Sequence, residues 1–162
     1  MKTRQNNYAY IDGANLYEGI RDLGWQLDYH RFRKWLRKKY SITKAYLFIG
    51  LIPKYKDLYT YLQEAGFTLV FKETVYGGNG KPKGNCDADL VLYVVRDLYE
   101  GMFDSSVIVS SDGDYASVVQ LLLQKNKLTS VISPSNNCSI LIKRTNGRIV
   151  YLDQVRTKVD KK

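Results

Sequence analysis

The chain of 162 residues is 44% hydrophobic and 25% charged, and 25 lysines and arginines against 16 acidic residues give it a net charge of +9. This length fits one domain of roughly 100–150 residues with its own core, and the composition excludes a largely disordered chain. Two cysteines and one histidine argue against a disulfide scaffold and a structural zinc site. The basic charge favours a polyanionic partner, most commonly nucleic acid.

The first half of the chain alternates apolar runs with amphipathic helical patterns. Tyr-Ala-Tyr-Ile-Asp at 8–12 is rich in aromatic and β-branched residues, which favours a strand. Asp28 stands where a helix would be capped, and Gly66 where one would end. The expected elements are a strand at 8–12, helices at 14–23 and 28–39, a strand at 45–52, a helix at 55–65 and a strand at 67–76.

The second half continues the alternation after a loop at 77–85 that is rich in glycine, asparagine and proline. Val94, Leu98 and Met102 fall on one face of the helix that follows the loop. The expected elements are helices at 87–102, 114–126 and 137–145, and strands at 105–111, 128–133 and 148–152. One domain thus spans residues 1–152, with a basic tail at 153–162, of which we expect residues 155–162 to be frayed.

Strands that alternate with helices are typical of a mostly parallel sheet with helices on both faces. The sequence therefore predicts an α/β fold, a three-layer α/β/α sandwich. In such sheets ligands bind beyond the carboxyl ends of the strands. Residues that directly follow a strand are therefore the first candidates for function.

Acidic residues stand at several of these positions. Asp12 ends the first strand, Asp112 and Asp114 follow the strand at 105–111, and Asp87 begins the helix after the loop. On neighbouring strands these carboxylates would repel one another, and a hard cation such as Mg²⁺ or Mn²⁺ would offset the repulsion. Each aspartate alone also fits a helix cap or a turn. Their recurrence after three elements favours the metal site.

The amino-acid sequence excludes several other phosphate-binding and cofactor-binding motifs. Gly80-Lys81 is followed by Pro82 rather than by the serine or threonine of a P-loop. No glycine-rich dinucleotide fingerprint follows the strand at 8–12. Ala14 stands where a phosphatase of the haloacid dehalogenase type carries its second aspartate.

Three stretches resemble the signature blocks of the NYN domain, a branch of the PIN-like ribonuclease superfamily, and most of all its bacterial LabA-like group. They are YIDGANLY at 10–17, KGNCDADLVL at 83–92 and VSSDGDYASVV at 109–119. Their order and spacing fit over residues 8–152. The resemblance implies a PIN-like sandwich in a nuclease domain at 1–152, and an endoribonuclease that uses Mg²⁺ or Mn²⁺ to hydrolyse RNA phosphodiester bonds.

The resemblance also implies which residues act. The metal-binding aspartates of the family fall on Asp12, Asp87, Asp112 and Asp114, and the asparagine of its first block falls on Asn15. Cations held there would clamp a phosphate and lower the pKa of a bound water, so the chemistry needs no histidine. Asn15 would orient a carboxylate or a phosphate oxygen by hydrogen bonding.

Cationic side chains near this centre are candidate RNA contacts. Lys81 and Lys83 belong to the loop, and Arg33 and Arg37 to the basic outer face of the helix at 28–39. Both groups also fit a solvated surface. Of the 14 tyrosines, three beside the motifs could stack on unpaired bases, namely Tyr17, Tyr76 and Tyr115.

The predicted partner is RNA, with single-stranded or loop regions favoured. We expect no membrane association and a cytoplasmic location, because the chain has neither a leader of the signal-peptide type nor a long apolar window. A homodimer remains open. The alternatives are a non-catalytic RNA-binding or regulatory module with the same fold, and a metal-dependent phosphatase.

Overall fold

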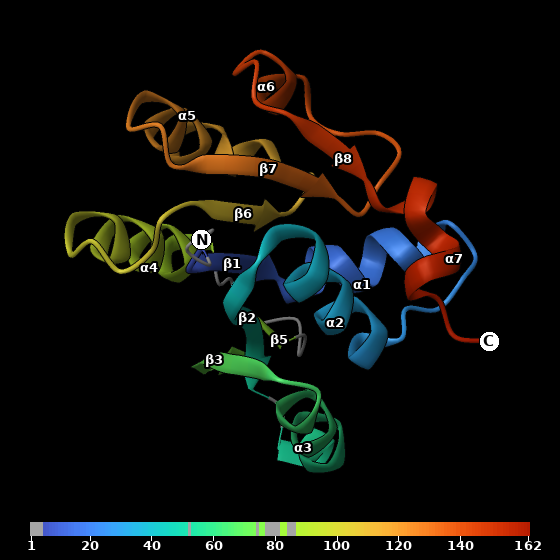
Figure 1. Ribbon diagram of the computed structural model, residues 1–162. Coiled ribbons are helices and arrows are strands. Elements are labelled where there is room, and N and C mark those ends of the chain that lie inside the picture. Colours follow the sequence, from blue (N-terminus) through green and yellow to red (C-terminus); the bar gives the residue numbers. More distant parts are fainter. Residues whose placement is uncertain (1–4, 52, 74, 77–81, 84–86) are drawn as a thin grey trace.

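The computed structural model describes residues 5–51, 53–73, 75–76, 82–83 and 87–162. Its centre is a six-stranded sheet in the order β3-β2-β1-β6-β7-β8, in which every neighbouring pair is parallel (Figure 1). The strands are β1 (Asn7–Asp12), β2 (Ile42–Leu51), β3 (Phe67–Glu73), β6 (Ser106–Val109), β7 (Leu128–Ser133) and β8 (Ile149–Tyr151). A separate antiparallel pair joins β4 (Val75–Tyr76) to β5 (Pro82–Lys83).

Helices lie between successive strands of the sheet, and the last helix follows β8. They are α1 (Gly13–Asp22), α2 (Tyr29–Tyr40), α3 (Lys56–Glu64), α4 (Asp87–Tyr99), α5 (Ala116–Gln124), α6 (Ile140–Lys143) and α7 (Arg156–Val159), with short 3₁₀ turns η1 (Pro53–Tyr55), η2 (Gly113–Tyr115) and η3 (Leu152–Val155). Within the described ranges, none of them is both long enough and apolar enough to cross a bilayer.

Strand alternation divides the core into two clusters, one on each face of the sheet. Ala9 and Ile11 of β1 pack with the apolar sides of α1 and α2, whereas Tyr8 and Tyr10 pack with α4 and α5. Figure 1 shows α1, α2 and α7 on one side of the strands and α4 and α5 on the other. This confirms the α/β fold with a parallel central sheet and helices on both faces. Because side chains alternate along a strand, Asp12 shares the α4 and α5 face with Tyr8 and Tyr10.

Most expected elements are present, and the differences lie at their ends. The expected helix at 87–102 stops at Tyr99, because the chain turns at Gly101 with φ of +67°. Met102, which the pattern placed on one helix face with Val94 and Leu98, is therefore 42% exposed. The expected strand at 67–76 ends as β3 at Glu73, and most of the loop at 77–85 lies outside the described residues.

One acidic side chain of α4 is buried in the protein core, which the sequence pattern did not predict. Asp97 is buried and accepts a hydrogen bond of 2.7 Å from the Tyr10 hydroxyl through its Oδ2. Its Oδ1 lies 3.1 Å from Nη2 of Arg96. Burial, together with the hydrogen bond to Asp97, raises the pKa of Tyr10 far above its usual value, so the phenol remains a donor. A buried carboxylate is tolerated here because both oxygens have partners.

The expectation that residues 155–162 fray is wrong. The segment forms η3 and α7, and α7 packs on α2. Val159 is completely buried, and its carbonyl accepts a 2.8 Å hydrogen bond from Asp28 N. Arg31 donates to the carbonyl of Asp160 at 2.8 Å. The basic residues at the end of the chain suggested a solvated tail. Val159 and Asp160, which lie among them, hold the segment against α2.

Val159→Ala should lower the free energy of unfolding by about 1–3 kcal/mol, because it removes fully buried methyl groups. Denaturant unfolding would measure the change. The control is Lys158→Ala at an exposed position of the same helix, which should have almost no effect. Equal stability of the Val159→Ala variant and the wild type would contradict the packing of this segment.

Candidate metal centre

Three carboxylates converge at the carboxyl edge of the sheet. Asp12 ends β1, Asp112 follows β6, and Asp87 begins α4. β1 and β6 are adjacent parallel strands, which brings Asp12 and Asp112 to the same edge. One carboxylate oxygen from each of the three residues lies within 4.8 Å of the others. Such an all-oxygen donor set fits a hard divalent cation such as Mg²⁺ or Mn²⁺.

Tyr115 ties two of these carboxylates together. Its hydroxyl lies 2.7 Å from Asp87 Oδ1 and 3.0 Å from Asp12 Oδ2. The hydroxyl has one proton, so it donates to one carboxylate at a time. The tyrosine is fully buried, and burial and the two negative charges raise its pKa far above the usual value. Tyr115 therefore stays protonated and bridges the two acids.

In this structure the aspartates can cap helices and still be available to bind a metal ion. Asp12 Oδ1 accepts a 3.1 Å hydrogen bond from Asn15 N and caps α1. Asp112 Oδ1 accepts a 2.9 Å bond from Asp114 N and caps η2. These bonds fix the two side chains at the strand ends, since a capping carboxylate has a defined rotamer. Each carboxylate still has lone pairs for another ligand.

Asn15 joins the two loops that carry the aspartates. Its Oδ1 accepts hydrogen bonds from Ser111 N at 3.0 Å and from Ser111 Oγ at 3.2 Å. Ser110 Oγ in turn accepts a 3.1 Å bond from Asp112 N. Asn15 thus holds the loop after β6 against the first turn of α1, and so positions Asp112 beside Asp12.

Two glycines allow the backbone to approach closely at this edge. A Cβ atom on Gly13 would meet the Ile49 side chain and lie 2.8 Å from the Phe48 carbonyl oxygen. A Cβ atom on Gly113 would lie 2.5 Å from Ser139 Oγ. Real Cβ atoms do not make such contacts, so the Asp-Gly sequence in each loop has a steric origin.

Among the residues that the structure describes, the cluster carries more negative charge than its surroundings compensate. Burial raises the pKa of Asp12; the hydrogen bonds from Asn15 N and Tyr115 lower it, and the charges of Asp87 and Asp112 raise it. The pKa of Asp114 is raised chiefly by Asp112, with smaller contributions from desolvation and Asp87. A cation among the three half-buried carboxylates would remove this electrostatic cost.

The remaining predicted residues are placed differently. Asp114 is exposed and is not one of the three carboxylates that converge. Lys81 and the side chain of Lys83 lie outside the described residues. Tyr115 is fully buried, so the expectation that its ring stacks on bases is wrong. Sequence reasoning missed its contact with the acids, although it follows the Asp-Gly-Asp motif directly.

Arg33 and Arg37 are not brought to the carboxylates. Arg33 donates to the carbonyls of Gly66 at 3.1 Å and Ile42 at 3.2 Å. Ile42 pairs with Asn7, at the start of β1, five residues before Asp12. At about 3.3 Å per residue this separates Arg33 from the cluster by roughly 17 Å. Arg37 is exposed on the next turn of α2, farther along the same helix.

Comparison with known proteins gives consistent results. The model of the NYN domain matches residues 8–153. The chain is 24% identical to the "Low amplitude and bright protein LabA" of Synechococcus elongatus, over 94% of this chain and 86% of that protein. A crystal structure of a protein of unknown function from Vibrio parahaemolyticus superposes with a TM-score of 0.80 at 21% identity, covering 99% of this chain and 100% of the other. This last similarity concerns the fold.

Tyr115→Phe should destabilise the cation-free protein by about 1–3 kcal/mol, because Asp12 and Asp87 lose their shared donor and remain close together. Thermal unfolding in EDTA would measure the loss. The same measurement with Mn²⁺ should give a smaller difference, since a cation would then offset the repulsion. An equal loss in both conditions would contradict this account and leave only a packing defect.

Asp12→Asn should raise the melting temperature of the cation-free protein at pH 7. The pKa of Asp12 is raised in the fold, so the stability associated with its protonated form is present below about pH 4 and is lost as the pH rises through the folded-state pKa. Asparagine keeps the cap and removes the charge. Each kcal/mol gained corresponds to about 2–4 °C.

The gain from Asp12→Asn should shrink towards pH 4, where the wild-type carboxyl group is protonated. Mn²⁺ should stabilise the wild type and have little effect on the variant. A lower melting temperature of the variant in EDTA at pH 7 would show that repulsion is not the dominant cost at this site.

Proposed function

Because the chain belongs to the NYN domain family, we propose that it is a metal-dependent endoribonuclease that holds its divalent cation on Asp12, Asp87 and Asp112. The observation that carries the proposal is the convergence of three carboxylates within 4.8 Å in a protein whose net charge is +9. The caps that Asp12 and Asp112 form do not require three carboxylates to converge, and like charges at this distance destabilise the fold. A cation site that receives a phosphodiester accounts for it.

Mg²⁺ or Mn²⁺, when bound, would supply a water of lowered pKa and positive charge that stabilises the phosphate in the transition state. Asp12, Asp87 and Asp112 would hold the cation from three separate elements. Tyr115 would keep Asp12 and Asp87 in position through its hydroxyl. In this proposal Asn15 is a positioning residue, because it bonds Ser111 and thereby fixes the Asp112 loop.

Asp114 has a separate role in this proposal. Its carboxylate is exposed beside Asp112 and Asp87, whose charges raise its pKa. We assign it to the solvent side of the centre, where it would accept a proton from the attacking water or coordinate through a water. Asp114→Asn should therefore reduce turnover without abolishing cation binding, whereas the loss of Asp112 should affect both.

The test is cleavage of an end-labelled single-stranded RNA by the purified protein, with Mn²⁺ or Mg²⁺ and with EDTA. Asp112→Asn should lower kcat at least 100-fold, because each centre then lacks one of its three carboxylate ligands. The matched control is Glu100→Gln, which removes an exposed charge just beyond α4, about 20 Å from Asp87 along the helix axis. That variant should cleave like the wild type.

The outcomes separate the possibilities. Cleavage that requires both a cation and Asp112 would support the nuclease. Cation binding without cleavage of any RNA or DNA would contradict the proposed catalysis and favour a binding module with the same fold. Hydrolysis of small phosphate esters with inert RNA would indicate a phosphatase.

A further inference from the structure

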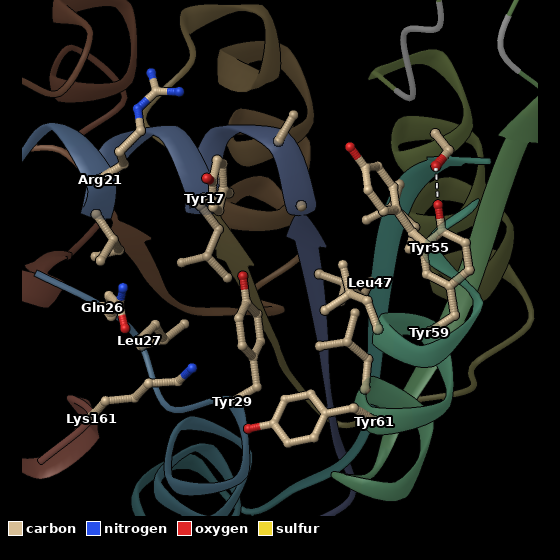
Figure 2. A pocket seen from close by; sticks show the side chains of 18 of the residues that line it. Tyr17, Arg21, Gln26, Leu27, Tyr29, Leu47, Tyr55, Tyr59, Tyr61 and Lys161 are labelled. Atoms are coloured by element: carbon tan, nitrogen blue, oxygen red, sulfur yellow. Dashed lines mark hydrogen bonds between the residues drawn. The ribbon is translucent and has the colours of Figure 1, made fainter. Parts of the chain in front are cut away.

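A cavity of about 1020 Å³ opens on the α1 face of the sheet, opposite the face to which Asp12 points. Its walls come from α1, the start of α2, the end of β2 and α3 (Figure 2). The apolar side chains behind it include Leu16, Ile20, Leu47 and Leu62, which belong to the core on this face. This volume is at the upper end of the roughly 300–1,000 Å³ that ligand pockets occupy.

Five tyrosines line the space, which we call the tyrosine cavity: Tyr17, Tyr29, Tyr55, Tyr59 and Tyr61. Tyr17 is 60% exposed and Tyr55 is 42% exposed, on opposite sides of the opening (Figure 2). Burial and the neighbouring Tyr17 and Tyr61 raise the pKa of Tyr29 to about 12. The cavity thus offers the neutral hydroxyl of Tyr29 and the exposed rings of Tyr17 and Tyr55, and unpaired nucleobases stack on such rings.

Charge at the cavity favours bases over phosphates. Among the described residues that line it, the charged ones are Arg21, Lys161 and Asp57, which gives a net charge of +1. The Arg21 guanidinium lies 5.7 Å from the centroid of the Tyr17 ring. A phosphate-binding pocket of this size would need several cations or converging backbone amides. An uncharged aromatic group, with its phosphates left outside near Arg21 and Lys161, fits this lining better.

The cavity adjoins the carboxylates across one turn of helix. Gly13 and Ala14 line it and directly follow Asp12 in the chain. The first turn of α1 thus has the acidic centre on one side and the tyrosine cavity on the other. A single-stranded RNA that crosses this turn of α1 would bring one phosphate to the carboxylates and the adjoining nucleotide to the tyrosine rings.

We propose that the tyrosine cavity binds bases of single-stranded RNA adjoining the phosphate at the carboxylate cluster. This inference rests on the proposed ribonuclease function and adds a binding subsite to it. Stacking on Tyr17 and Tyr55 gives the affinity, and paired bases are disfavoured because their faces are already covered by their neighbours. The protein therefore selects unpaired RNA by the accessibility of its bases.

The test compares a short oligouridine with the same oligonucleotide carrying abasic sites, which keeps the phosphates and removes the bases. Fluorescence anisotropy in EDTA gives affinities while the RNA stays intact. Tyr17→Ala and Tyr55→Ala should each weaken binding of the intact RNA by roughly 5- to 100-fold, the loss expected for one stacked base. Neither should change the affinity for the abasic RNA. Both residues are exposed, so the variants should fold, and their melting temperatures check this.

The matched control is Tyr99→Ala, which removes a tyrosine that is 70% exposed on α4 and does not line the cavity. It should bind both RNAs like the wild type. Tyr17→Phe keeps the ring and should retain most of the affinity. A second readout is the KM for cleavage in the presence of Mn²⁺, measured with the intact and with the abasic RNA.

Equal affinity of the wild type for intact and abasic RNA would overturn the base subsite, while cleavage by the same protein would leave the proposed function standing. Absence of both RNA binding and cleavage would overturn the two together. If Tyr17→Ala leaves RNA affinity unchanged but alters the oligomeric state in light scattering, the cavity is a protein interface, and the inference is wrong.

Discussion

The hydrogen bonds of the Tyr115 hydroxyl with Asp12 and Asp87 are the interaction on which the rest of this site depends. They join the end of β1, the start of α4 and the turn before α5, three elements far apart in the chain. A neutral donor between two carboxylates lowers their repulsion and prevents them from separating. The tyrosine is held in turn by the apolar cluster around Tyr10, Leu90 and Val119. The packing of one face of the sheet therefore sets the geometry of the acids.

The alternation of β1 gives the two faces of the molecule different chemistry. Every second side chain of β1 faces α4 and α5, on the side where the carboxylates lie. The side chains between them face α1 and α2 and pack in the core behind the tyrosine cavity. The first turn of α1 is the boundary between them, and Gly13 lets that turn lie directly against β2. An insertion of one residue in β1 would exchange the two faces, because the side-chain period of a strand is two. Both sites therefore depend on the register of a single strand.

The sequence predicted the fold and the position of the acids for a common reason, which is that both follow from local patterns. A parallel strand buried on both faces is a continuous apolar run, and its carboxyl end is recognisable by the polar residue that follows. Contacts between distant segments leave no such pattern. The bond of Tyr115 to Asp87, the buried Asp97 beneath Tyr10 and the use of Arg33 in binding Gly66 each join residues at least 28 positions apart. The prediction for the segment after residue 152 failed because its many charged residues indicate a solvated tail, whereas one buried valine is enough to anchor it.

The anchored C-terminal segment has a practical consequence for work with this protein. Lys161 donates its backbone N–H to the Gln26 carbonyl at 3.0 Å, and both residues line the tyrosine cavity. Anything joined after Lys162, such as a purification tag, a fluorescent protein or a further domain, would begin at the rim of that opening. A fused segment there would compete with whatever enters the cavity or would act as a lid over it. Attachment at the other end of the chain avoids this problem, because β1 begins at the opposite edge of the sheet from the carboxylates.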